Sequence, residues 1–135
     1  LFAEYERAKI MERTRRGKLQ RAREGALVGG HAPFGYLWIK RNESSRARLE
    51  ISDYQAAIIR RMYRLLVDDH LSTRAIARKL TQDGVATAMG AAQWQPTAVF
   101  RMLTNPAYKG SYRYRQSGQE EILIPVPSLV DEATW

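Results

Sequence analysis

The chain has 135 residues, no cysteine, and a formal net charge of +8 with a pI near 10.1. A hydrophobic content of 44% is enough to bury one core of ordinary size, so we expect a largely self-folding chain about one domain long. No window approaches the roughly 20 apolar residues that span a bilayer, and no signal peptide opens the chain; both absences predict a soluble, cytoplasmic protein. The lack of cysteine excludes disulfides and thiolate metal sites and fits a reducing compartment.

The positive charge is unevenly distributed along the chain. Residues 51–115 contain ten basic and four acidic side chains, whereas residues 116–135 contain four acidic and no basic ones. A polyanion should therefore contact the first 115 residues and avoid the tail. Nucleic acid is the leading partner class, ahead of an anionic membrane, and the alternative is that the charges only solvate the surface.

Residues 1–24 predict one long helix, because they contain no proline, one glycine and mostly good helix formers. An apolar stripe marks the first half only, and the second half is expected to be too polar for burial. At about 1.5 Å per residue the helix is roughly 36 Å long, near one turn of duplex DNA. The stripe comprises Leu1, Phe2, Tyr5, Ala8 and Met11, continued only by Leu19 and Ala22; the basic residues around the second half include Arg13, Arg16, Lys18, Arg21 and Arg23.

Residues 25–36 are expected to be a glycine- and proline-rich linker, with Gly25 ending the helix and Gly29-Gly30-His31 in an extended stretch. Alternation over residues 36–40 and 47–51 predicts a small β-hairpin with a polar loop between them. Ser52 and Gln55 then form a capping-box pattern before a core helix. Its expected apolar face comprises Ile58, Ile59, Met62, Leu65 and Leu66, with Arg60, Arg61 and Arg64 outside.

Residues 72–105 predict a helix-turn-helix variant. Ser72 or Thr73 can cap a first helix that packs through Ile76 and Leu80, and Asp83-Gly84 supplies a turn. Pro96 is suited to the first position of a second helix that ends before Asn105-Pro106. Val99, Met102 and Leu103 should face the core, which leaves Gln95, Thr97, Ala98 and Arg101 as candidates for contacts with base edges.

Three tyrosines follow in a predicted strand, where Tyr108, Tyr112 and Tyr114 alternate with basic residues. We expect them on a core face, and stacking on single-stranded bases is the alternative. Pro125 and Pro127 lead into the acidic segment ending at Trp135, where we expect the chain to be truncated.

No catalytic residue, cofactor or metal site is predicted. His31 and His70 lack an evident acidic or nucleophilic partner, and no serine has a sequence signature of activation. Asp68-Asp69-His70 is interpreted as the polar end of a helix and not as a metal site, because adjacent residues point in different directions and no fourth ligand is near in sequence.

Several blocks of residues, taken together with their order and spacing, resemble the sequences of the large serine site-specific recombinases. Residues 2–17 resemble the end of their catalytic domain and the long helix that leaves it, and residues 29–36 resemble the entry to their recombinase domain. Further matching positions are Ile76-Ala77, Leu80, Gly84, Trp94, Val99, Leu103, Asn105-Pro106, Tyr108, Gly110 and residues 124–135; Glu6, Arg7, Glu12, Arg13 and Gly17 carry the helix signature.

The resemblance implies a parent integrase, invertase or transposase, encoded by a bacterium or phage and associated with the nucleoid, whose nucleophilic serine lies upstream of Leu1. It implies a dimer and a synaptic tetramer, a connector along the minor groove, and a recombinase domain that reads the major groove of a double-stranded attachment site. No membrane partner is implied. The zinc domain and coiled coil of the family have no counterpart in residues 1–135.

The predicted fold is α+β and mostly helical, with a long N-terminal helix (1–24), a linker (25–36) and a DNA-binding domain (37–135) containing a hairpin, the helix-turn-helix variant and short strands. Two alternatives remain open, a transcriptional repressor and a basic RNA-binding protein. Expected backbone or minor-groove contacts are Arg13, Arg16, Lys18, Arg21, Arg23, Gly29, Gly30, His31, Arg74, Arg78 and Lys79.

Overall fold

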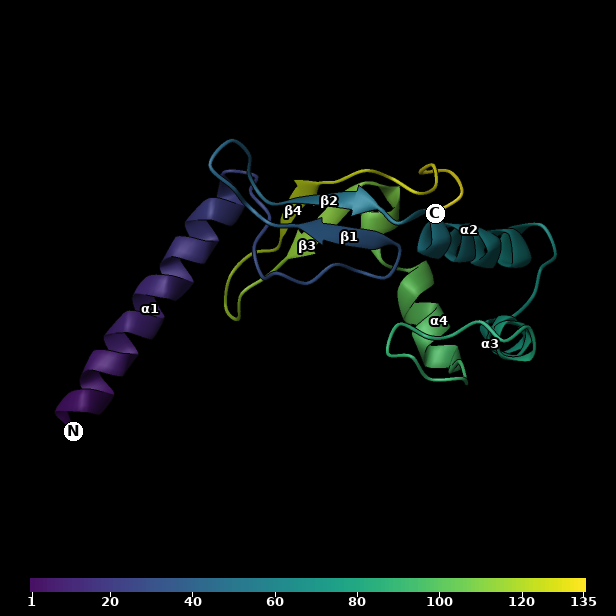
Figure 1. Ribbon diagram of the computed structural model, residues 1–135, viewed down its shortest axis with the longest axis horizontal. Coiled ribbons are helices and arrows are strands. Elements are labelled where there is room, and N and C mark those ends of the chain that lie inside the picture. Colours follow the sequence, from purple (N-terminus) through teal and green to yellow (C-terminus); the bar gives the residue numbers. More distant parts are fainter.

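The computed structural model describes residues 1–135 and contains four α-helices and two separate two-stranded antiparallel sheets (Figure 1). The predicted α+β, mostly helical fold is confirmed. No helix combines the length and the apolar character needed to cross a membrane. In chain order the elements are α1 (Phe2–Arg23), β1 (Tyr36–Ile39), β2 (Arg48–Ile51), α2 (Asp53–Val67), α3 (Thr73–Gln82), α4 (Pro96–Leu103), the 3₁₀ helix η1 (Pro106–Lys109), β3 (Ser111–Tyr114) and β4 (Ile122–Pro125).

Helix α1 extends away from the other elements and contacts them only near its C-terminal end (Figure 1). Every residue from 1 to 16 is exposed, so the predicted apolar stripe of the first half has no partner within the chain. Leu19 and Ala22 are buried, and Ala22 packs with Val28 and Ile124. The expectation that the second half is too polar for burial is therefore wrong for these two residues, because β4 lies against their side of the helix.

The predicted hairpin forms from β1 and β2, which pair from Tyr36 opposite Ile51 to Ile39 opposite Arg48. The capping box does not form at α2: Ser52 is the N-cap, but its hydroxyl accepts no cap hydrogen bond. Gln55 instead accepts a hydrogen bond from the backbone amide of Gly35 at 2.8 Å, which ties the connector to the first turn of α2.

Helix α2 lies at the centre of the core. Ile58, Ile59, Met62 and Leu65 are buried as predicted, whereas Leu66 is 37% exposed. Tyr63, which the apolar pattern did not select, is buried in its place, and its hydroxyl donates to the carbonyl oxygen of Leu103 at 2.8 Å. A tyrosine is thus buried here because the end of α4 supplies an acceptor for its hydroxyl.

Two further tyrosines join the connector to the C-terminal part of the chain. The single hydrogen of the Tyr36 hydroxyl is shared between the carbonyl oxygens of Ala107 and Pro127, and the Tyr108 hydroxyl donates to that of Phe34 at 2.7 Å. Their rings stack with centroids 6.0 Å apart. Burial raises the pKa of Tyr36 to about 12 and also raises the pKa of Tyr108 above its ordinary value.

The C-terminal region differs from the single predicted strand. Asn105 accepts a hydrogen bond from the amide of Ala107 and starts η1, so Tyr108 lies on a 3₁₀ turn and β3 begins only at Ser111. An unpredicted strand, β4, pairs with β3 from Ser111 opposite Pro125 to Tyr114 opposite Ile122. Tyr108 is buried and Tyr112 and Tyr114 are partly buried, as expected for tyrosines on a core face.

Candidate nucleic-acid interface

Helices α3 and α4 form a packed pair. The Ser72 hydroxyl caps α3 by accepting from the Ala75 amide at 3.1 Å, and Ile76, Ala77 and Leu80 are buried. Pro96 starts α4, which buries Val99 and Leu103. The predicted starts of both helices and their inward faces are confirmed.

Residues 83–95 connect these helices, and Trp94 holds this segment in place. Its backbone amide donates to the Thr81 hydroxyl at 2.9 Å, and its indole N–H donates to the Val85 carbonyl at 2.8 Å. The ring of Phe34 meets that of Trp94 edge-on with centroids 6.0 Å apart. Trp94 therefore ties the end of the long connection back to α3 and to Val85.

The outer face of α4 carries the four candidate base contacts. Gln95, Thr97 and Arg101 are exposed, and Ala98 is partly buried. The Arg101 guanidinium makes no ion pair or hydrogen bond within the chain. Phe100, which the sequence did not single out, is 61% exposed and adds an apolar side chain to this surface. An apolar group beside polar ones is suited to thymine methyl groups in a major groove.

The connector before β1 has free backbone donors. Gly29, Gly30 and His31 are exposed, and their amides donate no hydrogen bond within the chain. Both glycines adopt positive φ angles, of 107° and 75°, with open space around each. The connector is anchored at both ends, by buried Val28 and by the Gly35 amide bonded to Gln55.

A hollow of about 390 Å³ lies between this connector and α4. It places His31 of the connector beside Arg101 of α4, and Arg113 of β3 also lines it. Two segments that are 70 residues apart in sequence therefore line one hollow, in which Arg101 has no ion pair and Arg113 pairs with Glu121 at 3.6 Å. Arg113 was not among the contact residues predicted from the sequence. The alternation of tyrosines with basic residues around Arg113 is the sequence pattern that could have indicated it.

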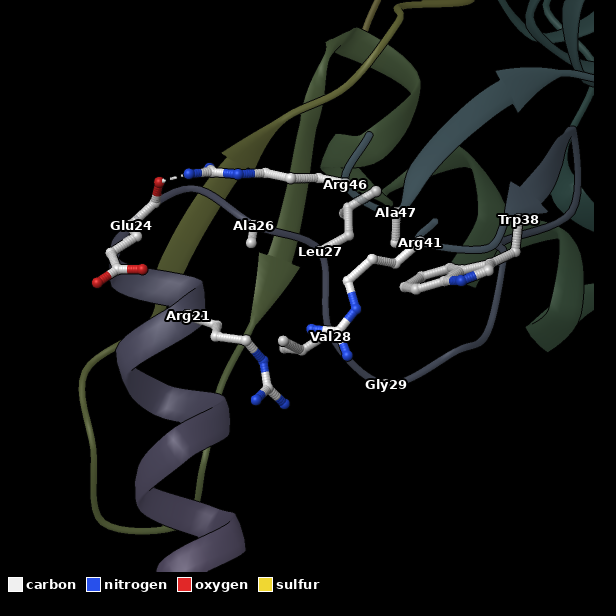
Figure 2. A pocket seen from close by; sticks show the side chains of 10 residues that line it. All are labelled: Arg21, Glu24, Ala26, Leu27, Val28, Gly29, Trp38, Arg41, Arg46 and Ala47. Atoms are coloured by element: carbon white, nitrogen blue, oxygen red, sulfur yellow. Dashed lines mark hydrogen bonds between the residues drawn. The ribbon is translucent and has the colours of Figure 1, made fainter. Parts of the chain in front are cut away.

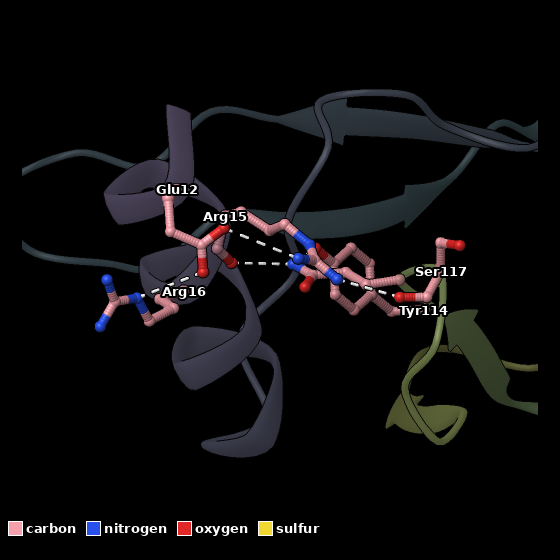
Figure 3. Close-up of polar contacts among 6 residues, drawn as sticks. Glu12, Arg15, Arg16, Tyr114 and Ser117 are labelled. Carbon is pink, nitrogen blue, oxygen red and sulfur yellow. Dashed lines mark hydrogen bonds and ion pairs between the residues drawn. The ribbon is translucent and has the colours of Figure 1, made fainter. Parts of the chain in front are cut away.

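The candidate backbone contacts on α1 are all exposed: Arg13, Arg16, Lys18, Arg21 and Arg23. Arg16 forms an ion pair with Glu12 at 3.4 Å, and Arg15 approaches the same carboxylate at 3.7 Å. Arg15 also donates to the Ser117 carbonyl oxygen at 2.9 Å in the turn between β3 and β4 (Figure 3). The other four candidates on α1 have no carboxylate within 4.0 Å.

The three candidates on α3, Arg74, Arg78 and Lys79, are exposed and likewise have no carboxylate within 4.0 Å. Arg61 of α2 differs from them, because it pairs with Asp83 at the end of α3 and holds the pKa of that carboxyl below its usual range. Arg61 thus joins α2 to the end of α3, whereas Arg74, Arg78 and Lys79 have no carboxylate partner and are available to an anion.

No group of three or more His, Cys, Asp or Glu side chains is arranged to hold a metal ion. His70, at the end of α2, has a positive φ of 55° and lies in the turn to α3. The candidate contact residues on α1, the connector, α3 and α4 offer mainly arginine, lysine and backbone amides, groups that bind phosphate and base acceptors.

Comparisons with known proteins identify the family and the fold. The family model described as Recombinase matches residues 53–135. A relative from Bacillus subtilis (strain 168), named "Putative DNA recombinase", is 31% identical over 160 aligned residues that cover 99% of this chain and 31% of the relative. The chain thus spans about a third of the length of this curated relative.

Two solved structures have the same fold. A crystal structure described as an LSR–DNA complex matches with a TM-score of 0.64 at 18% identity, over 90% of this chain and 35% of that chain. A structure concerned with the sequence requirements of the Listeria innocua prophage attP site matches with a TM-score of 0.61 at 18% identity, over 90% of this chain and 47% of that chain. The Recombinase model covers more than half of the sequence and agrees with the resemblance of the sequence blocks, so the chain belongs to the Recombinase family of large serine recombinases.

Proposed function

We propose that this chain binds duplex DNA in a sequence-specific manner, as the DNA-binding part of a recombinase that acts in site-specific recombination. In this proposal, α3 and α4 act as a helix-turn-helix variant, and α4 enters the major groove. Residues 25–36 form the linker that follows the adjacent minor groove, residues 1–24 form the connecting helix that contacts phosphates, and residues 37–135 form the DNA-binding domain.

One observation carries the proposal: the hollow that brings the connector and the outer face of α4 together, lined by His31, Arg101 and Arg113. In duplex DNA a minor groove and the next major groove are separated by one phosphodiester strand. Elements that enter both grooves must therefore leave room for that strand between them, and this hollow provides that room.

The DNA–protein complex in the first matched structure supports the proposal by analogy of fold. Strand exchange is proposed only for the full-length recombinase, because the chain spans about a third of its relative. The proposed parent acts as an integrase, transposase or invertase through a dimer and a synaptic tetramer, and the DNA-binding step proposed here is common to all three roles.

Selection from a pool of random duplexes tests this proposal without knowledge of the attachment site. The chain is incubated with the pool at moderate salt, and bound DNA is recovered and sequenced over several rounds. We expect enrichment of one sequence, which then serves as the cognate duplex. Failure to enrich any sequence, or tighter binding to a matched RNA pool, would refute the proposal and favour the RNA-binding alternative.

A further inference from the structure

A second hollow, of about 320 Å³, lies at the elbow where α1 meets the β1–β2 hairpin. Figure 2 shows the guanidinium groups of Arg21, from the last turn of α1, and Arg41, from the hairpin loop, both extending into this region around Val28. Leu27 and the Trp38 ring supply apolar walls. Side chains from three separate segments thus converge on one space.

The charges in this hollow are unevenly satisfied. Arg46 donates to the backbone carbonyl of Glu24 at 3.3 Å and so neutralises part of the negative C-terminal end of α1 (Figure 2). The Glu24 carboxylate accepts from the Gln20 side chain. Arg21 and Arg41, by contrast, have no carboxylate within 4.0 Å and make no side-chain hydrogen bond. Two unpaired guanidinium groups at the same hollow repel each other until an anion lies between them.

We propose that this hollow holds one phosphodiester group of the DNA backbone, bridged by Arg21 and Arg41. The proposal rests on the proposed DNA-binding function and adds the hairpin loop to the interface. Planar guanidinium groups match the geometry of phosphate oxygens, and the apolar walls strengthen the attraction by lowering the local dielectric. Gly29, whose amide is free, lines the same hollow, so the phosphate would border the groove that the connector follows.

A shared phosphate would also fix the direction of α1. Arg21 belongs to α1 and Arg41 to the loop of the β1–β2 hairpin. One anion between them would therefore join the helix to the hairpin, which make few direct contacts with each other. DNA binding then rigidifies the elbow at the point where the helix leaves the domain.

Salt-dependent binding of the selected duplex tests the shared phosphate. The variants are Arg21→Gln, Arg41→Gln and the double variant, with Lys40→Gln as a control that removes one exposed charge from the same hairpin outside the hollow. The double variant should reduce the slope of log K against log salt by about 0.9, the value for one phosphate, and weaken binding about eightfold at 0.1 M salt. Neither single variant should exceed this loss, and Lys40→Gln should leave the slope unchanged.

Each other outcome is decisive. An unchanged salt slope in the double variant would show that the hollow binds no phosphate of the duplex. A loss of slope of about 1.8 would mean that Arg21 and Arg41 contact two separate phosphates and do not share one. An equal loss in Lys40→Gln assigns the effect to general charge. Saturable binding of inorganic phosphate alone, abolished in the double variant, identifies a free-phosphate site and overturns the assignment to DNA. If the unaltered chain binds no duplex, the proposed function itself fails, which is distinguishable from all of these.

A distance measurement provides a readout of the elbow. Because the chain has no cysteine, Ala8→Cys and Ala86→Cys give two unique exposed positions for spin labels. The distribution of label distances should narrow on addition of the duplex and should stay broad in the Arg21→Gln and Arg41→Gln double variant, compared at DNA concentrations that saturate both proteins. Equal narrowing in both proteins would contradict the bridging role.

Discussion

Arg101 and Arg16 should contribute to DNA binding in different ways. Arg101 extends from the outer face of α4 without a partner in the chain, where a guanidinium can make a bidentate contact with guanine. Arg16 lies on exposed α1, where it should contact phosphate. Arg101→Ala should therefore reduce discrimination between sequences, and Arg16→Ala should reduce affinity for all duplexes alike.

The expected losses of affinity and of salt slope follow from the type of DNA contact that each arginine can make. Loss of a bidentate guanine contact costs about 1 to 3 kcal/mol, which is about a 5- to 160-fold loss of affinity on the cognate duplex. Loss of one phosphate contact lowers the salt slope by about 0.9. The ion pair of Arg16 with Glu12 should hardly change this loss of slope, because exposed ion pairs are weak. When Arg16 is removed, Glu12 still has Arg15 as a partner at 3.7 Å.

Fluorescence anisotropy titrations on the selected duplex and on a scrambled duplex, at several salt concentrations, measure both quantities. Thr104→Ala, at the exposed C-terminal end of α4 and outside the four candidate base contacts, is a control without charge loss. If Arg101→Ala weakens both duplexes equally, Arg101 is a phosphate contact or a solvated charge, and the base-reading surface lies elsewhere.

Three further predictions concern the connector, catalysis and pH. Proteolysis at Gly29 should be fast in the free chain and slow on the cognate duplex, because a minor groove would order the connector; equal rates would indicate an ordinary hinge. Incubation with supercoiled plasmid should leave its topology unchanged, and nicking abolished by a point mutation in this chain would contradict this expectation. Urea unfolding should shift to lower urea concentration as the pH rises from about 10 to 12, because burial raises the pKa of Tyr36 to about 12 and the folded state therefore keeps a proton that the unfolded state loses. In Tyr36→Phe this alkaline shift should be smaller, whereas stability at neutral pH should fall with the loss of the hydrogen bonds to Ala107 and Pro127.

Local patterns predicted the helices well because their signals are contained in a few neighbouring residues. Pro96 marks the first turn of α4, and Ser72 caps α3 with its own hydroxyl. The buried face of α2 follows from helical spacing, apart from Leu66 and Tyr63. These two exchange roles because the acceptor for the Tyr63 hydroxyl is Leu103, 40 residues away in the chain, which no local pattern contains.

The candidate site was predictable only in part for the same reason. Exposed basic residues on α1, α3 and α4 could be chosen from spacing, but their grouping depends on tertiary contacts. Arg113 reaches the hollow beside α4 because β3 pairs with β4, and β4 was missed because Ile122–Pro125 is short and ends in proline. Gln55 likewise has the sequence signature of a cap but bonds to Gly35, because the connector passes the start of α2.

The exposure of α1 predicts a gradient of stability along this helix. Its first 16 residues make no buried contact, and isolated helices of such length are marginal in water. The ion pair of Glu12 with Arg16 adds only about 0.3 to 0.5 kcal/mol. From Arg15 onward the helix is held from outside: Gln116 donates to the Arg15 carbonyl at 2.8 Å, and Ala22 packs on Ile124.

Hydrogen exchange of the monomeric chain without DNA should therefore be fast over residues 2–14 and slower over residues 19–24, whose amides are bonded within the packed end of the helix. Ile124→Ala removes the packing beneath Ala22 and should extend fast exchange to the end of α1, whereas Leu123→Ala, on the 56% exposed neighbour, should not. Uniformly slow exchange from residue 2 to residue 24 in a monomer would mean that helix propensity alone maintains α1. The contacts with β4 would then not be needed to keep the helix folded where it leaves the domain.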